Sequence, residues 1–218
     1  MYGYSLMDVG VGSFIMANGL VDSSYESSTR VIKGKVWSKI RPLLVLGFMR
    51  LVAVKMSNYH EHVTEYGIHW NFFFTLATVK AASLLISPPV RPGLFALLIL
   101  GVYEAVLKLG LEQWILSEST VRDGLISANR EGIFSLLGYL ALHYAALEIG
   151  HFIRNPHRST FGGWFQLLLL LMATTFFGYV GLQVSEITFG KPSRRLANSS
   201  FCFWMVTDLF HFKNSIDF

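Results

Sequence analysis

Apolar residues along the chain fall into seven continuous blocks separated by polar loops, rather than along one face of each helix. The blocks cover about residues 5–21, 40–55, 69–87, 92–111, 132–153, 161–184 and 197–212. A transmembrane helix needs about 20 predominantly apolar residues, so the third to sixth blocks are long enough and the first two are marginal. The pattern predicts an all-α, polytopic membrane helix bundle with about six to seven transmembrane helices.

Composition supports an integral membrane protein. Of the 218 residues, 52% are hydrophobic and 15% are charged, whereas a soluble domain carries about 25% charged residues. The net charge of +4 is too small and too scattered for a nucleic-acid interface. With Cys202 as its one cysteine, the chain has no intrachain disulfide. We therefore expect a single transmembrane domain over residues 1–218 and no nucleic-acid partner.

The loops between the blocks suggest an orientation in the membrane. If every block crosses, one side holds loops 22–39, 88–91 and 154–160, and the other holds loops 56–68, 112–131 and 185–196. Lys and Arg are modestly in excess on the first side, which the positive-inside rule places in the cytoplasm. The Ser- and Lys-rich segment 22–39 is then a cytoplasmic loop.

The chemically rich stretches share the opposite, non-cytoplasmic side. They are "YHEHVTEYGIHWN" (59–71), "ISANREGIF" (126–134) and "SRRLANSS" (193–200), and Asp8 near the start of the first block joins them. Polar clusters that meet at one membrane face can form one site. We therefore predict that any active site lies at this face.

Asp8 is a lone carboxylate among apolar residues and glycines in "LMDVGVGSF". An aspartate at a helix centre costs roughly 2.5–3.5 kcal/mol on insertion scales, so it faces the bundle interior or a polar cavity. Gly10 and Gly12 allow another helix or a ligand to approach the backbone. Asp8 is a candidate general base; the alternative is a buried aspartate bonded to a neighbouring helix.

The stretch from Tyr59 to Glu65 invites a metal interpretation through His60, His62 and Glu65. The zinc motif HExxH places two histidines on one helical face, but these histidines are two residues apart and point in different directions on a helix. We expect no metal. An interfacial segment anchored by Trp70 explains much of the pattern, although not its density of ionisable groups.

Arginines suggest a phosphate site. Arg130 lies in "SANREGIF", at a predicted helix start, and Arg194 and Arg195 lie in "KPSRRLAN". Guanidinium groups bind phosphate oxygens bidentately, and helix N-termini favour anions. Contact with lipid headgroups is the simpler alternative for basic residues at an interface.

Charged residues inside the apolar blocks favour a second kind of function. Lys80, Glu104, Lys108 and Glu148 lie within predicted spans, and intramembrane charges often mark ion or substrate pathways. Glu104 and Lys108 are four residues apart, so we expect them to pair on a helix. The sequence shows no inverted repeat of the transporter type.

Four blocks of the sequence resemble the glycosylphosphatidylinositol inositol acyltransferase family, the PIG-W type. They are "LMDVGVGSFIMANGLV", "YHEHVTEYGIHWNFFFTL", "SANREGIFSLLGYLAL" and "SRRLAN", and they occur in the family's order from near residue 3 to about residue 206. The resemblance implies a multi-pass protein of the endoplasmic reticulum membrane. It also implies transfer of a fatty acyl chain, typically palmitoyl, from acyl-CoA to the inositol of glucosaminyl-phosphatidylinositol during GPI-anchor biosynthesis.

The resemblance also implies roles for particular residues. Asp8 of the LMD block is carried over as catalytic, and a protonated His69 is a candidate for stabilising the oxyanion, as are Asn71 and Asn129. We expect no cofactor, with acyl-CoA as co-substrate. The expected substrate-binding residues are His60, His62, Glu65, Asn71, Asn129, Arg130, Glu131, Arg194 and Arg195.

The sequence departs from the family at both ends. Family members have further spans before the LMD block and after the RRLAN block, and "VTDLFHFKNSIDF" does not resemble the usual continuation. We therefore expect a fragment of a larger polytopic acyltransferase. The alternative functions are an inactive truncated isoform or non-catalytic subunit and, less favoured, a lipid transporter or flippase.

Overall fold

A computed structural model describes residues 3–22, 33–56, 66–88, 90–117, 122–154 and 161–208. Within these residues every regular element is a helix. They are α1 (Leu6–Leu20), α2 (Lys33–Met56), α3 (Phe72–Leu85), α4 (Pro92–Val106), the π-helical turn η1 (Leu107–Leu111), α5 (Glu112–Leu116), α6 (Leu125–Ala128), α7 (Arg130–Phe134), α8 (Leu136–Arg154), α9 (Phe161–Phe189) and α10 (Ser199–Asp208). Each predicted apolar block contains a helix.

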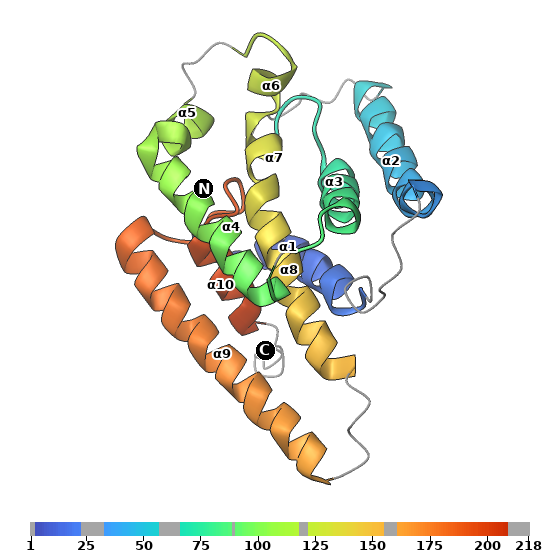
Figure 1. Cartoon of the computed structure of the whole chain (residues 1–218). Coiled ribbons are helices and arrows are strands. Elements are labelled where there is room, and N and C mark those ends of the chain that lie inside the picture. The colour runs from blue at the N-terminus through green and yellow to red at the C-terminus, as the bar shows by residue number, and fades with distance from the viewer. Residues whose placement is uncertain are drawn as a thin grey trace.

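Helix α8 is the centre of the bundle. It packs against α1, α3, α4 and α10, while α9 lies on the outside along α10 (Figure 1). Side chains of α8 such as Tyr139, Tyr144 and Ala146 are completely buried. A Cβ atom at Gly138 would overlap the carbonyl oxygen of Ala197, and one at Gly150 would overlap that of Leu20. Glycines on α8 therefore let neighbouring backbone approach closely.

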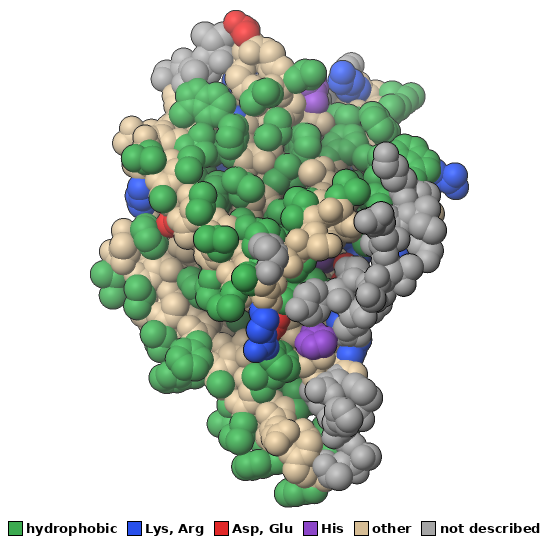
Figure 2. Space-filling model, viewed as in Figure 1, with side chains coloured by type: hydrophobic (Ala, Val, Ile, Leu, Met, Phe, Trp, Pro, Cys, Tyr) green, Lys and Arg blue, Asp and Glu red, His purple; other side chains and the backbone are tan. Residues whose placement is uncertain are grey.

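Three helical stretches are long and apolar enough to cross a membrane among the described residues. They are Pro92–Leu116, Arg130–Arg154 and Phe161–Phe189, with the shorter apolar helix Phe72–Leu85 beside them. Apolar side chains cover much of the visible surface (Figure 2). Trp164, Leu168 and Phe176 of α9 are among the exposed apolar side chains. The predicted all-α membrane helix bundle is confirmed. The number of six to seven spans and the orientation in the membrane stay predictions.

Two boundaries differ from the expected blocks. Helix α2 begins at Lys33 rather than near residue 40, so its first turns lie within the segment predicted as the 22–39 loop. Hydropathy missed these turns because Lys35 and Lys39 are polar, although lysine is a good helix former. The fourth block is broken at its end, where Gly110 takes a left-handed φ of 114° in η1. Glycine adopts that conformation readily.

Candidate functional site

Two consecutive arginines, Arg194 and Arg195, each form an ion pair with a carboxylate. Asp8, in the first turn of α1, places its Oδ1 3.0 Å from Nε of Arg194. The next residue, Arg195, places a terminal nitrogen 3.2 Å from Oε1 of Glu131. Because Arg194 and Arg195 are consecutive residues, with Cα atoms about 3.8 Å apart, we describe both pairs together. We call Asp8, Arg194, Arg195 and Glu131, together with Arg122 and Arg130, the arginine cluster.

Glu131 organises this cluster from the inside. Its carboxylate is completely buried and accepts hydrogen bonds from both terminal nitrogens of Arg122, at 2.7 and 3.1 Å. Arg195 donates a third at 3.2 Å. A buried carboxylate is tolerated only when it is paired and hydrogen-bonded. Glu131 therefore fixes two guanidinium groups that come from distant parts of the chain.

Arg130 is also completely buried, and its guanidinium group binds backbone carbonyls at the end of α5. Its Nε donates to the carbonyl of Ile115 at 3.0 Å, and a terminal nitrogen donates to the carbonyl of Ser117. Its guanidinium lies 5.3 Å from the ring centroid of Trp114. These contacts satisfy the carbonyls at the end of α5. The other terminal nitrogen has no hydrogen-bond partner in the part of the chain that the structure describes.

The loop that carries Arg194 is held rigidly. Tyr139 of α8 donates its hydroxyl hydrogen to the Arg194 carbonyl at 3.0 Å. The side-chain oxygen of Asn198 accepts from the backbone of Ser193 at 2.9 Å. Ala197 has a left-handed φ of 48°, an unusual conformation for a residue with a Cβ, of the kind that clusters at functional sites. Both arginines are therefore presented by a fixed backbone.

The predicted amide donors serve the fold in this structure. Asn129 accepts from the backbone nitrogen of His69 at 2.8 Å and donates to the carbonyl of Leu125, which ties the segment before α3 to α6. Asn71 caps α3 and donates to the carbonyl of Gly47. Their predicted part in oxyanion stabilisation, and that of the partly buried His69, stays a prediction.

The structure thus brings together most of the predicted site residues that it describes. Asp8 pairs with Arg194, Glu131 pairs with the consecutive Arg195, and the backbone nitrogen of His69 donates to Asn129. The predicted residues His60, His62 and Glu65 lie outside the described residues.

Sequence reasoning missed Arg122 at this site. A buried Glu131 needs a cationic partner, and that requirement is the signal by which a nearby arginine could have been found.

Comparison of the sequence with known proteins shows which family this chain belongs to. The GWT1 family model matches residues 1–213. The chain belongs to the GWT1 family. It is 39% identical to the bovine glucosaminyl-phosphatidylinositol acyltransferase PIGW and 35% identical to the human one, over 94% of this chain and 43% of each relative. It is 34% identical to GPI-anchored wall transfer protein 1 of Candida albicans, over 94% of this chain and 51% of the relative. The chain therefore spans about half or less of the length of these relatives.

A second polar cluster of this GWT1-family chain lies at the other end of α1. Lys80 of α3 places its Nζ 2.5 Å from Oδ2 of Asp22, and Nε2 of His143 lies 3.5 Å from the same oxygen. Arg154 donates to the carbonyls of Leu20 and Asp22. These interactions hold the end of α1 against α3 and α8.

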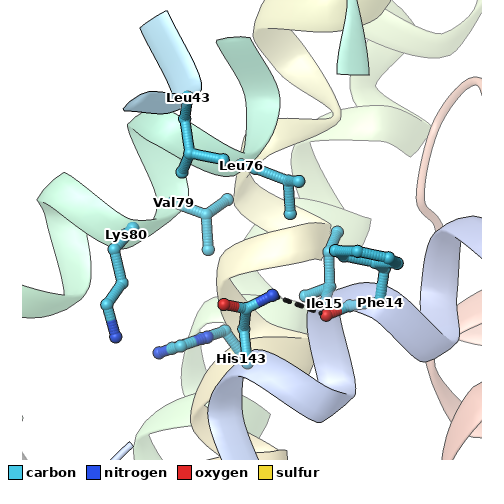
Figure 3. Close-up of a pocket in the computed structure, with 8 residues that line it drawn as sticks. Phe14, Ile15, Leu43, Leu76, Val79, Lys80 and His143 are labelled. Carbon is cyan, nitrogen blue, oxygen red and sulfur yellow. Dashed lines mark hydrogen bonds between the residues drawn. The ribbon is translucent and has the colours of Figure 1, made fainter. Parts of the chain in front are cut away.

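A cavity of about 90 Å³ opens beside this second cluster. Figure 3 shows Lys80 and His143 on one side of the cavity and apolar side chains on the others. The lining residues are Phe14, Ile15, Asn18, Leu43, Leu76, Val79, Lys80 and His143. The cavity is therefore mostly apolar, with its polar groups drawn from α1, α3 and α8.

The predicted pairing of Glu104 with Lys108 is wrong. Glu104 accepts from the backbone nitrogen of Ser199 at 2.9 Å, at the start of α10. Lys108 lies 3.5 Å from Glu112 and donates to the carbonyl of Phe189 at the end of α9. The reason is tertiary: Glu104 is buried against the start of α10, whereas the Lys108 side chain is 43% exposed and pairs with Glu112 instead.

Each of the four intramembrane charges thus has a partner, since Glu148 accepts from Arg91. Paired intramembrane charges also occur along transport pathways, so the transporter alternative stays a prediction. Within the described residues, no group of three or more His, Cys, Asp and Glu side chains is arranged to hold a metal ion.

Proposed function

We propose that this chain carries out, as part of a GWT1-type enzyme, transfer of a fatty acyl chain to an inositol hydroxyl of glucosaminyl-phosphatidylinositol. The observation that carries the proposal is the family match over nearly the whole chain, because relatives of the family are named glucosaminyl-phosphatidylinositol acyltransferases. The acyl donor is acyl-CoA, with palmitoyl as the expected chain, and the location is the endoplasmic reticulum membrane.

The reaction needs a base, and Asp8 is our candidate. The hydroxyl oxygen attacks the thioester carbonyl, a carbon–oxygen bond forms and the carbon–sulfur bond breaks. The hydroxyl proton passes to the Asp8 carboxylate and from there to the departing thiolate. Asp8 suits this step because its side chain is 17% exposed, whereas Glu131 in the same cluster is completely buried. General base assistance is typically worth about 10²–10⁴-fold.

Arg194 would orient this base. Its Nε, 3.0 Å from Oδ1 of Asp8, fixes the direction of the carboxylate. Tyr139 in turn holds the Arg194 backbone. A protonated His69, next to the Asn129 contact, is our candidate donor to the developing oxyanion.

The test is an acyl-transfer assay in membranes from cells that lack the activity. Membranes with the chain receive acyl-CoA and glucosaminyl-phosphatidylinositol, and the expected product is an acylated inositol lipid that resists phospholipase C. Asp8→Asn should lower turnover roughly 10²–10⁴-fold. Asp123→Asn, which changes an exposed aspartate, is the matched control. Normal turnover in Asp8→Asn would exclude Asp8 as the base.

The same assay distinguishes acyl transfer from the alternative that the chain is an inactive form or a non-catalytic part. If the chain yields no product while a longer relative in identical membranes does, the chain is an inactive form or a non-catalytic part.

A further inference from the structure

The arginine cluster carries more positive than negative charge around Glu131. Among the described residues, Arg122, Arg195 and Glu131 are the side-chain charges that act on Arg130. Three guanidinium groups against one carboxylate leave a net charge of +2 in this group. The neighbouring Asp8–Arg194 pair is neutral and does not offset it. Uncompensated charge away from water is costly, so the cluster favours an added anion.

Two guanidinium nitrogens of the cluster are ready to donate. One terminal nitrogen of Arg130 and Nε of Arg195 are buried and have no hydrogen-bond partner among the described residues. A buried donor without an acceptor costs about as much as a lost hydrogen bond. Both the unpaired donors and the excess positive charge therefore favour binding of an anion that is rich in acceptor oxygens.

The cluster is also accessible at its outer edge. The side chains of Arg122 and Arg195 are 18% and 19% exposed, whereas Glu131 and Arg130 are completely buried. Arg122 and Arg195 both donate to Oε1 of Glu131, and the buried charge of Arg130 is close enough to interact with both. A ligand would thus meet two oriented guanidinium groups backed by a third positive charge.

We propose that Arg122 and Arg195 form a subsite for a phosphate-ester oxyanion of the substrate, which rests on the proposed acyl transfer. Guanidinium groups bind phosphate oxygens in a planar, bidentate manner that an ammonium group does not reproduce. The phosphate comes either from the lipid phosphodiester or from coenzyme A.

The position of the subsite relative to Asp8 suggests that it orients the inositol ring for acyl transfer. In an inositol phospholipid the phosphodiester is attached to the same ring that carries the hydroxyl groups. Because Arg194, the partner of Asp8, directly precedes Arg195, the proposal puts the ring of a lipid whose phosphate is on Arg195 within reach of Asp8. The arginine cluster then holds the phosphate while Asp8 meets the hydroxyl.

Equilibrium binding to the purified chain in detergent micelles tests the subsite. The probes are a short-chain phosphatidylinositol and, separately, coenzyme A, with no acyl donor present. Arg122→Gln and Arg195→Gln should each weaken binding of one phosphate probe roughly 10- to 100-fold. Arg91→Gln is the control, because Arg91 is an exposed arginine that pairs with Glu148 away from the cluster. Weakened phosphatidylinositol binding identifies the lipid phosphodiester, and weakened coenzyme A binding identifies the acyl donor.

The remaining outcomes are also decisive. Should Arg122→Gln not fold, Arg122→Lys replaces it, because lysine keeps an ion pair with Glu131 but lacks the planar, bidentate geometry of a guanidinium group. Weaker phosphate binding by that variant supports the subsite, and unchanged binding contradicts it. No measurable binding of either probe to the unaltered chain, or equal binding by every variant, overturns the proposal. Since no acyl transfer occurs in this assay, Arg122-dependent binding without activity would retain the subsite and reject the proposed function.

Discussion

The ion pair between Lys80 and Asp22 gives a quantitative test of how α1 is held. Asp22 has a side chain that is 2% exposed, and its Oδ2 lies 2.5 Å from Nζ of Lys80. Lys80→Met removes that partner and leaves a buried carboxylate with His143 at 3.5 Å. Removing one partner of a buried pair costs about 3–5 kcal/mol. We expect the lower end of this range, because Lys80 itself is 16% exposed.

A double-mutant cycle separates the pair from its surroundings. Asp22→Leu should cost less than Lys80→Met, because the longer, partly exposed lysine can reorient toward a polar region. Replacing both partners by apolar residues is often nearly neutral, so the double variant should be more stable than Lys80→Met alone. Lys39→Met, at an exposed position on α2, should change stability by about 0.5 kcal/mol or less.

The measurement is the free energy of unfolding from a denaturant titration in detergent micelles. Additive losses in the Asp22→Leu, Lys80→Met double variant would show that the two side chains do not interact energetically. That result would refute the view that this pair fastens α1 to α3.

Other changes test other contacts. Asn71→Ala removes the α3 cap and should lower the unfolding free energy by about 0.5–2 kcal/mol in the same titration. Gly138→Ala forces a Cβ into the Ala197 carbonyl and should lower the thermal midpoint markedly, whereas an unchanged midpoint would contradict the close packing seen there. Cys202 is buried, so maleimide should label it only after denaturation. Glu131→Gln leaves the arginines around it without their carboxylate and should lower the thermal midpoint by more than Asp123→Asn does.

The fold could be predicted from sequence because its main signal is local. Blocks of apolar residues mark the helices whatever their neighbours do, and each of the seven contains one. The errors arise where hydropathy carries no signal. The start of α2 at Lys33 lies in a polar stretch, and the π-turn from Leu107 to Leu111 leaves no trace in a count of apolar residues. The wrong pairing of Glu104 with Lys108 has a tertiary cause, because the buried Glu104 carboxylate accepts from the backbone of Ser199.

The site was predictable only in part because its contacts are tertiary. Asp8, Glu131 and Arg194 were conspicuous as charges beside apolar blocks. Their partners were not, since Glu131 and Arg195 are 64 residues apart and Arg194 hydrogen-bonds the carbonyl of Met7, 187 residues away. Arg122 lies in a loop, where a single arginine gives no sequence signal. Only the folded structure shows that it pairs with the buried carboxylate of Glu131.

The two ends of α1 show why one carboxylate suits chemistry and the other suits structure. Both Asp8 and Asp22 are paired with a cation from another element, and such pairing lets a short helix with an acid at each end pack into an apolar bundle. They differ in access, since the Asp8 side chain is 17% exposed and that of Asp22 is 2% exposed. A catalytic base must be accessible to its substrate, whereas an ion pair that holds two helices together is shielded from water. Asp22→Asn should therefore impair stability and activity together, while Asp8→Asn should impair activity with the smaller loss of stability.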